Sequence, residues 1–215
     1  GNRFVTRSLS NSQGVDGFAQ FKDIDVVHNG IEVESSWNPF DNLRLKGMLS
    51  IGDWRYTKDF AAELFDDNQQ SIGTGTLYLK DAKVGDAAQF VSYLEADYRL
   101  GSKLNVDLGY RFVDNLYADY SITDSEFTQP DNAGALKLPS YGLVDFGTTV
   151  RFNLFGNDAS FRVNINNLLD TTYIAESNSN IHADASSTTW NGVDTRNYVW
   201  FGFGRTWNAS LKYRF

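Results

Sequence analysis

The chain has 215 residues, of which 41% are hydrophobic and 15% aromatic, with 16 Phe, 11 Tyr and 5 Trp. Its uninterrupted apolar runs are only a few residues long, far short of the roughly 20 that a transmembrane helix needs, so a helical membrane protein is excluded. It has no cysteine, which excludes disulfides and thiolate metal sites, and its net charge of −8 argues against nucleic acid as a partner.

Apolar and polar residues alternate in segment after segment, which predicts an all-β protein of about seven long antiparallel strands. In the first of these segments we expect an irregularity near Asn29-Gly30. The strands are predicted over residues 18–37, 43–51, 90–100, 104–112, 144–152, 161–165 and 205–215.

The connections between these strands are alternately short and long. Short turns are predicted near Pro39, Gly101 and Gly156. The long connections are rich in Asp, Asn, Ser, Thr and Gly, and they span residues 57–88, 114–140 and 169–197. Short turns at one end and long polar loops at the other are typical of the periplasmic and extracellular ends of an outer-membrane β-barrel.

The last strand has two chemically different faces. Polar residues from Thr206 to Arg214 occupy one face, as expected where one side of a strand meets lipid and the other meets water. Arg205 lies where a membrane strand of about 9–11 residues ends, so we expect it among head groups. The apolar face resembles the C-terminal signal that the barrel assembly machinery recognises, and it consists of Trp207, Ala209, Leu211, Tyr213 and Phe215.

Alternation alone leaves open which face is buried, because a soluble lipocalin-like barrel would place the same apolar residues inside. Large Leu, Phe, Tyr and Trp side chains crowd the apolar face, and aromatic residues cluster near both strand ends, which favours the membrane barrel. At the short-turn end this aromatic boundary is predicted at Trp37, Phe40, Tyr98, Phe152, Tyr213 and Phe215. At the long-loop end it is predicted at Trp54, Tyr56, Phe112, Tyr117 and Tyr141.

Several segments together resemble one family. Asn166-Asn-Leu-Leu-Asp-Thr-Thr-Tyr173, followed by a long loop and the last strand, resembles the C-terminal end of TonB-dependent outer-membrane receptors. Gly30-Ile-Glu-Val-Glu34, followed by Ser, Trp and a turn with proline, is similar to an earlier strand of these barrels. Val84-Gly-Asp-Ala-Ala-Gln89 and Asn115-Leu-Tyr-Ala-Asp-Tyr120 extend the resemblance over nearly the whole chain.

The resemblance implies a barrel of about 22 strands that is plugged by an N-terminal domain with a motif for TonB. No segment here matches that plug or motif, so we expect residues 1–215 to be the C-terminal part of the barrel, with about its last seven strands. Phe215 is expected to be a true chain end and Gly1 to be preceded by further sequence.

The family also implies a function, which is active import across the outer membrane of a Gram-negative bacterium. The substrate would be a scarce nutrient such as a siderophore, haem, cobalamin, a glycan or a peptide, and the sequence does not distinguish among these. The implied partners are outer-membrane lipid, TonB through the missing plug, and the extracellular ligand.

Residues that carry chemistry are few, so we expect no enzyme, no cofactor and no metal site. His28 and His182 lie far apart in the sequence, and we interpret each as solvated or hydrogen-bonded. Asp66-Asp67 lacks the full ligand pattern of a calcium loop. Loop aromatics that could stack on a ligand at the external mouth are Trp190, Tyr198 and Trp200.

Acidic residues are expected to line the lumen of the barrel as two pairs. The resemblance implies that they form a polar wall in contact with basic groups of the plug. A role in a substrate path is the alternative. The four residues are Glu32, Glu34, Glu95 and Asp97.

Two other protein classes remain open. One is a complete small outer-membrane barrel of about eight strands with an adhesin, structural or enzymatic role, in which residues 3–10 supply the eighth strand. The other is a soluble ligand-binding barrel, which would stay in solution without detergent. A plug domain upstream of Gly1 would support the transporter, and a signal peptide ending there would support the small barrel.

Overall fold

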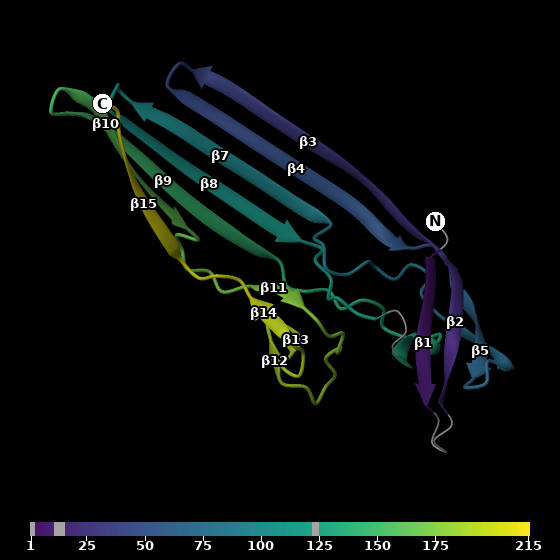
Figure 1. Cartoon of the computed structure of the whole chain (residues 1–215). Coiled ribbons are helices and arrows are strands. Elements are labelled where there is room, and N and C mark those ends of the chain that lie inside the picture. Colours follow the sequence, from purple (N-terminus) through teal and green to yellow (C-terminus); the bar gives the residue numbers. More distant parts are fainter. Residues whose placement is uncertain (1–2, 11–15, 122–124) are drawn as a thin grey trace.

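The computed structural model describes residues 3–10, 16–121 and 125–215, and it confirms an antiparallel all-β fold. Its main element is a seven-stranded sheet with the strand order β15-β10-β9-β8-β7-β4-β3 (Figure 1). In the described part of the chain the outer edges of β3 and β15 pair with no further strand, so the sheet is open. Its strands are β3 (Val26–Phe40), β4 (Leu43–Tyr56), β7 (Phe90–Leu100), β8 (Leu104–Asp114), β9 (Tyr141–Leu154), β10 (Asn157–Asn166) and β15 (Thr206–Tyr213).

Short turns join these strands in pairs where the sequence predicted them. The β3–β4 turn occupies residues 41–42, and the β7–β8 turn occupies residues 101–103. The two-residue turn between β9 and β10 places both Phe155 and Gly156 at positive φ, 52° and 85°. Two positive φ values in a two-residue loop match the right-handed twist of the strands that the loop joins.

The expected first strand, residues 18–37, is divided at Asp25. Its first part, β2 (Asp16–Ile24), leaves the sheet and pairs with β1 (Arg3–Ser10) and β5 (Phe60–Asp66). The predicted irregularity at Asn29-Gly30 is wrong, because β3 pairs with β4 without a register shift from Val26 to Trp37. Gly30 lies opposite Gly52 in this register, so no side chain pushes the strands apart at this position.

The eighth strand of the small-barrel alternative is also absent from the main sheet. β1 pairs with β2 and lies at the edge of a separate four-stranded sheet of order β1-β2-β5-β6, in which β6 spans Ser71–Leu77. Among the described strands, neither β3 nor β15 pairs with β1. The structure therefore does not favour a complete barrel built from this chain alone.

The long connections contain structure that the sequence did not predict. Besides β5 and β6 they include the 3-10 helix η1 (Ser125–Thr128). Short paired strands occupy the last connection and the segment before β15: β11 (Ile174–Ser177) with β14 (Val199–Phe201), and β12 (Thr189–Trp190) with β13 (Val193–Asp194).

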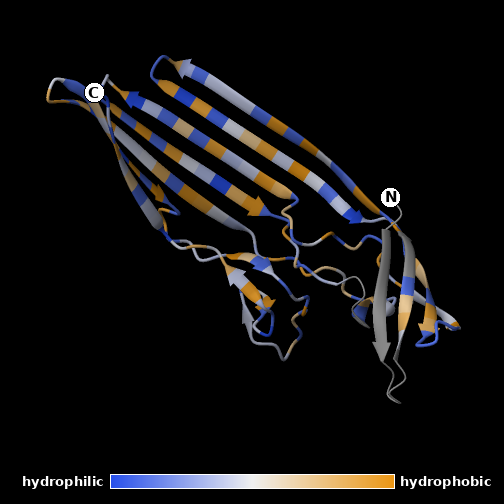
Figure 2. Cartoon of the chain, viewed as in Figure 1, coloured by the Kyte–Doolittle hydropathy of each residue, from blue (hydrophilic) through white to orange (hydrophobic). Residues whose placement is uncertain are grey.

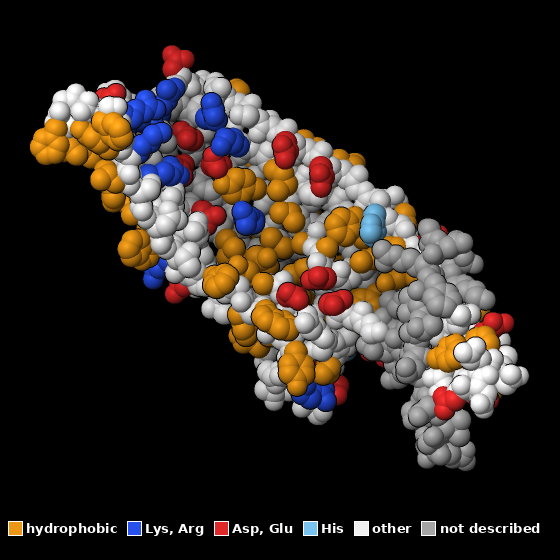
Figure 3. All heavy atoms as spheres, viewed as in Figure 1, with side chains coloured by type: hydrophobic (Ala, Val, Ile, Leu, Met, Phe, Trp, Pro, Cys, Tyr) orange, Lys and Arg blue, Asp and Glu red, His pale blue; other side chains and the backbone are white. Residues whose placement is uncertain are grey.

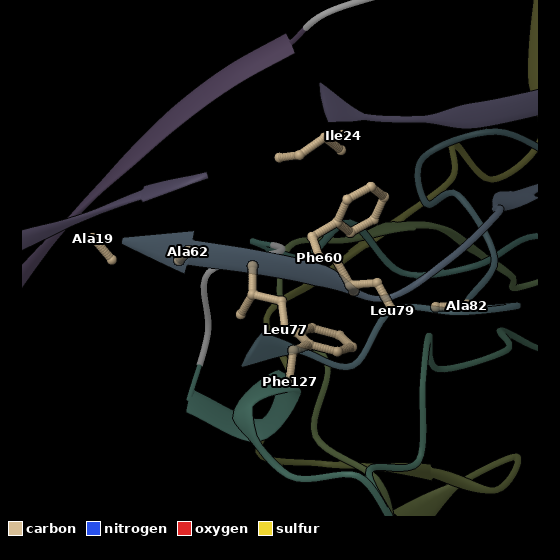
Figure 4. Packing of buried hydrophobic residues seen from close by; sticks show 8 residues of the cluster. All are labelled: Ala19, Ile24, Phe60, Ala62, Leu77, Leu79, Ala82 and Phe127. Carbon is tan, nitrogen blue, oxygen red and sulfur yellow. The ribbon is translucent and has the colours of Figure 1, made fainter. Parts of the chain in front are cut away.

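Buried apolar residues form two clusters, both within or beside the long connections. The first cluster is shown in Figure 4 and consists of Ala19, Ile24, Phe60, Ala62, Leu77, Leu79, Ala82 and Phe127. The second consists of Leu116, Ala118, Leu136, Leu138, Ile174 and Val193. The packed interior of the chain thus lies at the long-loop end, and most of the sheet extends beyond it.

Large apolar side chains of the sheet are exposed, and they are sorted to one face. Residues opposite one another in antiparallel register share a face, and the strands show the alternation as bands of colour in Figure 2. Apart from Phe40 beside the β3–β4 turn, every exposed large apolar residue of the seven strands belongs to this apolar face. They are Ile31, Val33, Trp37, Leu49, Ile51, Leu94, Tyr98, Leu100, Leu108, Tyr110, Val150, Phe152, Phe161, Trp207, Leu211 and Tyr213.

The predicted aromatic boundary at the long-loop end is largely wrong. Trp54 lies directly opposite His28 on the other face, and Tyr56 packs against the first buried cluster. Tyr141 also leaves the apolar face and stacks on Tyr173, with ring centroids 4.2 Å apart. Tyr56 and Tyr141 thus pack against the buried clusters of the long connections, and of the predicted set only Phe112 lies on the apolar face.

The described residues contain no helix that is both long enough and apolar enough to cross a membrane.

Candidate functional site on the polar face of the sheet

The face opposite the apolar face, here called the polar face, carries most charged residues of the sheet and is hollowed. Figure 3 shows Lys and Arg side chains gathered near its upper left end and carboxylates distributed along it. The charged residues whose strand register places them on this face include Glu32, Glu34, Arg44, Lys46, Glu95, Asp97, Arg99, Asp107, Arg111, Asp145, Arg151, Arg162 and Lys212.

A bidentate ion pair crosses the middle of this face. Arg162 on β10 donates from Nη1 to Oδ1 of Asp107 on β8 at 2.9 Å and from Nη2 to Oδ2 at 3.0 Å. The pair passes over β9 at Gly147, where an added Cβ would overlap Oδ2 of Asp107. The sequence places a glycine where any side chain would displace the two groups from the strong fork-to-carboxylate geometry.

A second polar group links β4, β7 and β8. Lys46 donates to Oε1 of Glu95 at 2.7 Å, and the Tyr93 hydroxyl donates to Oε2 at 2.8 Å. The Tyr93 ring lies across β8 at Gly109, where a Cβ would come within 2.7 Å of the hydroxyl oxygen. The guanidinium of Arg111 lies 5.8 Å from the centre of the same ring. The first group ties β10 to β8 across β9, and the second ties β4 to β7.

The four acidic residues predicted to line the lumen all lie on the polar face, but they do not form one cluster. Glu95 is neutralised by Lys46. Glu32 accepts a hydrogen bond from the Ser50 hydroxyl at 3.3 Å, and Asp97 accepts one from the Asn105 side chain at 3.3 Å. Glu34 borders a hollow of about 380 Å³. Their contact with a plug or a substrate remains a prediction.

The three loop aromatics predicted to contact a ligand differ in position. Trp190 is half-buried and meets the Phe201 ring edge-to-face at 5.1 Å, so it helps to hold the second cluster together. Tyr198 and Trp200 are exposed, with 76% and 51% of their surface accessible. Tyr198 and Trp200 remain predicted ligand contacts. The position of Trp190 is explained by its packing against Phe201.

The predicted assembly signal at the C-terminus follows the expected alternation. The strand pairs with β10 so that Trp207 lies opposite Ile165, and Leu211 lies opposite Phe161, on the apolar face. Ala209 and Tyr213 share that face by the same register. Phe215 follows the end of β15 and is fully exposed, with its ring 6.3 Å from that of Tyr213. Recognition by an assembly machinery remains a prediction.

The family motif at residues 166–173 is a turn that positions the last strand. Asn167 accepts a hydrogen bond from the Thr171 amide at 2.8 Å and donates one to the Thr171 carbonyl at 2.9 Å. Asp170 accepts the backbone N–H of Arg205 at 2.7 Å, next to the start of β15. Asn167 and Asp170 have φ values of 51° and 55°, a conformation that Asn and Asp tolerate. The sequence identified this motif but not its structural role.

Buried carboxamides, which the sequence analysis missed, tie the long connections together. Gln89 accepts from the Trp54 N–H and donates to the Trp54 carbonyl, both at 3.0 Å. Asn180 accepts the Leu136 N–H at 2.7 Å and donates to the Gly134 carbonyl at 2.8 Å. Each side chain replaces backbone pairing between segments far apart in the sequence. Their only signal in the sequence is an Asn or Gln within a polar segment, which is not distinctive.

Metal-binding groups do not gather in the structure. Within residues 3–10, 16–121 and 125–215, no group of three or more His, Cys, Asp or Glu side chains could hold a metal ion. His28 lies beside the Trp54 ring at 5.3 Å, and a ring nitrogen of His182 lies 3.1 Å from the Gly134 carbonyl oxygen. Asp66 accepts the backbone N–H groups of Asn68 and Gln70, so it closes a turn.

Comparison with known proteins relates the chain to receptors of one kind. No protein-family model matches it. It is 28% identical over 156 residues to the ferrioxamine B receptor of Salmonella typhimurium strain SL1344, and equally to that of strain LT2. Each match covers 72% of this chain but only 19% of the receptor, so the chain spans about a fifth of the length of these relatives. The chain forms a sheet of seven antiparallel strands, and its homologue is a receptor. It therefore shows the resemblance to TonB-dependent outer-membrane receptors that its sequence predicted.

Proposed function

We propose that the chain forms part of the barrel wall of a TonB-dependent outer-membrane receptor that imports a scarce nutrient. The observation that carries this proposal is the sorting of the sheet into an exposed apolar face and a hollowed polar face. Lipid would cover the first, and the second would face the lumen of the barrel.

The free energy of removing the apolar face from water supports a membrane location. Removing one large apolar side chain from water contributes about 1.5–3 kcal/mol. A dozen such side chains left exposed would forgo on the order of 20 kcal/mol, more than the 5–15 kcal/mol or so of net stability that a domain has. Contact with lipid would remove these side chains from water and so provide this stabilisation, which an aqueous surrounding would not.

The open edges of the sheet support further strands. β3 is 15 residues long, and its outer edge would expose a full row of backbone donors and acceptors to the membrane. Such edges do not occur in lipid, so we propose that strands from outside residues 1–215 complete a closed barrel. The match covers only 19% of each relative. We propose that those further strands, and the plug through which TonB acts, lie in the full protein outside residues 1–215.

The proposed receptor would bind its ligand and gate its passage, without catalysing a reaction. The relatives are named as receptors for ferrioxamine B, so an iron-siderophore is the substrate class to test first. Haem, cobalamin, glycans and peptides are the other classes. Exposed Tyr198 and Trp200 at the long-loop end are the residues proposed to contact the ligand.

The proposal can be tested with uptake of radioactive iron by iron-starved cells. Deleting the gene for the full protein should abolish uptake of its cognate siderophore, and restoring the gene should recover it only where TonB is present. Uptake of a panel of siderophores, haem and cobalamin that is unchanged by the deletion would contradict nutrient import. Tyr198→Ala with Trp200→Ala should lower uptake while the amount of protein in the outer membrane stays constant.

A further inference from the structure

The first and third long connections are linked mainly through the middle one. The first connection joins β4 to β7, the middle one joins β8 to β9, and the third joins β10 to β15. Among the described residues no hydrogen bond or ion pair joins the first connection directly to the third, although Ala88 of the first lies against the second buried cluster. Both are hydrogen-bonded to the described parts of the middle connection, residues 115–121 and 125–140. A disturbance in one outer connection therefore reaches the other chiefly through the middle one.

The 3-10 helix η1 of the middle connection contacts both outer connections through two neighbouring residues. Phe127 is fully buried in the first cluster with Leu77 (Figure 4), and its carbonyl accepts the Tyr78 N–H at 2.7 Å. Glu126, the preceding residue, accepts a hydrogen bond at Oε1 from the Asn180 side chain of the third connection at 2.6 Å. A displacement of η1 that breaks the contact on one side would therefore disturb the contact on the other.

A second route between the outer connections passes through Gly134. Asn132 donates from Nδ2 to the Tyr78 carbonyl of the first connection at 2.9 Å and accepts the Gly134 N–H at 3.0 Å. The Gly134 carbonyl accepts a hydrogen bond from Asn180 at 2.8 Å and lies 3.1 Å from a ring nitrogen of His182, both in the third connection. Gly134 has a φ of 72°, which glycine adopts at no steric cost. It is thus linked toward the first connection at its N–H and toward the third at its carbonyl.

Both routes end on the same side chain of the third connection, Asn180. It is buried, and its carboxamide is fully used: Oδ1 accepts the Leu136 N–H at 2.7 Å, and Nδ2 donates to both Glu126 and the Gly134 carbonyl. Removing this carboxamide would leave three polar groups of the middle connection without their partner. Because the loss of one partner of a buried hydrogen bond costs more than the bond itself contributes, Asn180 is the position at which the coupling can best be tested.

We propose that the three long connections open and close as one cooperative unit, in which η1 and Asn180 couple the first connection to the third. Destabilising one connection then lowers the protection of all three, and whatever orders one of them stabilises the other two by the same factor. The main sheet lies outside this unit, because its strands are held by their own backbone ladder. The coupling does not depend on nutrient import, since it follows from contacts within the chain alone.

The experiment measures hydrogen exchange by mass spectrometry on the full-length protein in detergent micelles, with β6 reporting on the first connection and β11 on the third. Asn180→Ala should speed exchange at least about tenfold in β11 and by a similar factor in β6. None of the residues bonded to the Asn180 side chain belongs to the first connection, so the effect on β6 measures the coupling. In the reverse direction Phe60→Ala, in the first connection, should speed exchange in β11 as well, because a coupling between two sites is reciprocal.

The matched control is Asn178→Ala, because Asn178 has the same side chain two residues away but is exposed. It should change exchange in both strands by less than about twofold. Glu126→Ala removes only one partner of Asn180 and should give the same pattern with smaller factors, which keeps the test decisive if Asn180→Ala does not fold. Heat-modifiable migration in gels shows whether each variant is folded.

Two outcomes would overturn the proposal. Faster exchange in β11 with unchanged exchange in β6 would show that the outer connections open independently. Equal acceleration in β8 of the main sheet would show global unfolding in place of a separate unit. Since no nutrient or TonB is present, failure of this assay is separate from failure of the import proposal.

Discussion

The seven-stranded sheet and the long connections at one end of it are organised by opposite rules. In the sheet, large apolar side chains point to one face and are exposed, while charged residues pair across the other. In the long connections, apolar residues are buried in two clusters, and carboxamides such as Gln89 satisfy backbone groups inside. The connections therefore carry a packed interior of their own, whereas the sheet leaves its apolar face exposed and is held together by its backbone ladder and by ion pairs on its polar face.

Removing a large side chain from the first buried cluster should have the largest effect, confined to the connections. Phe60 is almost fully buried there (Figure 4), and Phe60→Ala should cost about 3–5 kcal/mol. Hydrogen exchange should show β5 and β6 losing protection while β8 keeps it. Phe155→Ala, at a fully exposed turn, is the control, with a cost within about 0.5 kcal/mol. Equal loss of protection in β8 would show that the two regions do not differ as described.

A charge on the apolar face should have the next largest effect, and only in lipid. Leu108 is in the middle of β8 on that face, so Leu108→Arg should destabilise the full protein in lipid vesicles by about 2–4 kcal/mol. Ser50→Arg is the matched control, because Ser50 lies on the polar face beside Glu32. Urea titrations that give the same midpoint shift for both variants would refute the assignment of the faces.

A glycine on the polar face tests how the sheet is held together. Gly147→Ala would place a Cβ against Oδ2 of Asp107 and Nη2 of Arg162, so both side chains must shift, and weakening of their bidentate pair should cost up to about 1–3 kcal/mol. Adding Asp107→Asn should then cost less than it does in the original protein, because the pair is already weakened. Gly75→Ala meets only ordinary contacts in β6 and should be close to neutral. Additive costs in urea titrations would contradict the role given to Gly147.

The same contrast explains what the sequence could predict. Strands of the sheet follow a local rule, so period-two alternation predicted residues 90–100 as a strand, and β7 has these bounds. The clusters in the connections assemble from single residues far apart, such as Phe60, Leu77 and Phe127, and no periodic pattern marks them. Tyr56 was misplaced for this reason: its ring packs against the first buried cluster, which alternation does not describe.

Among the candidate site residues, the face on which a strand residue lies was predictable, and contacts with residues far away in the sequence were not. Glu32 and Glu95 could be assigned to the polar face from parity alone. Neutralisation of Glu95 by Lys46 depends on the register of β4 against β7, which the sequence does not show.

The smallest effect concerns pH and the last long connection. Asp194 has a side chain that is 1% exposed, and it is paired with Arg196 at 2.6 Å. The Arg196 guanidinium, with help from the Ser187 hydroxyl and the Arg196 backbone N–H, holds the pKa of Asp194 well below its usual range. A lowered pKa in the folded state means that the stabilisation is fully present above the unfolded pKa of about 3.9 and is lost as the pH falls through the folded value.

Protection of β12 and β13 against hydrogen exchange, corrected for intrinsic rates, should therefore be constant from about pH 7 to pH 5 and decrease below about pH 4. Asp194→Asn should already show reduced protection at neutral pH and approach the original protein as the pH falls, because both then carry a neutral side chain. Asp67→Asn, in the exposed turn after β5, should leave β12 and β13 unchanged. Loss of protection in the main sheet over the same pH range would mean that the connections and the sheet unfold together, and the contrast between them would fail.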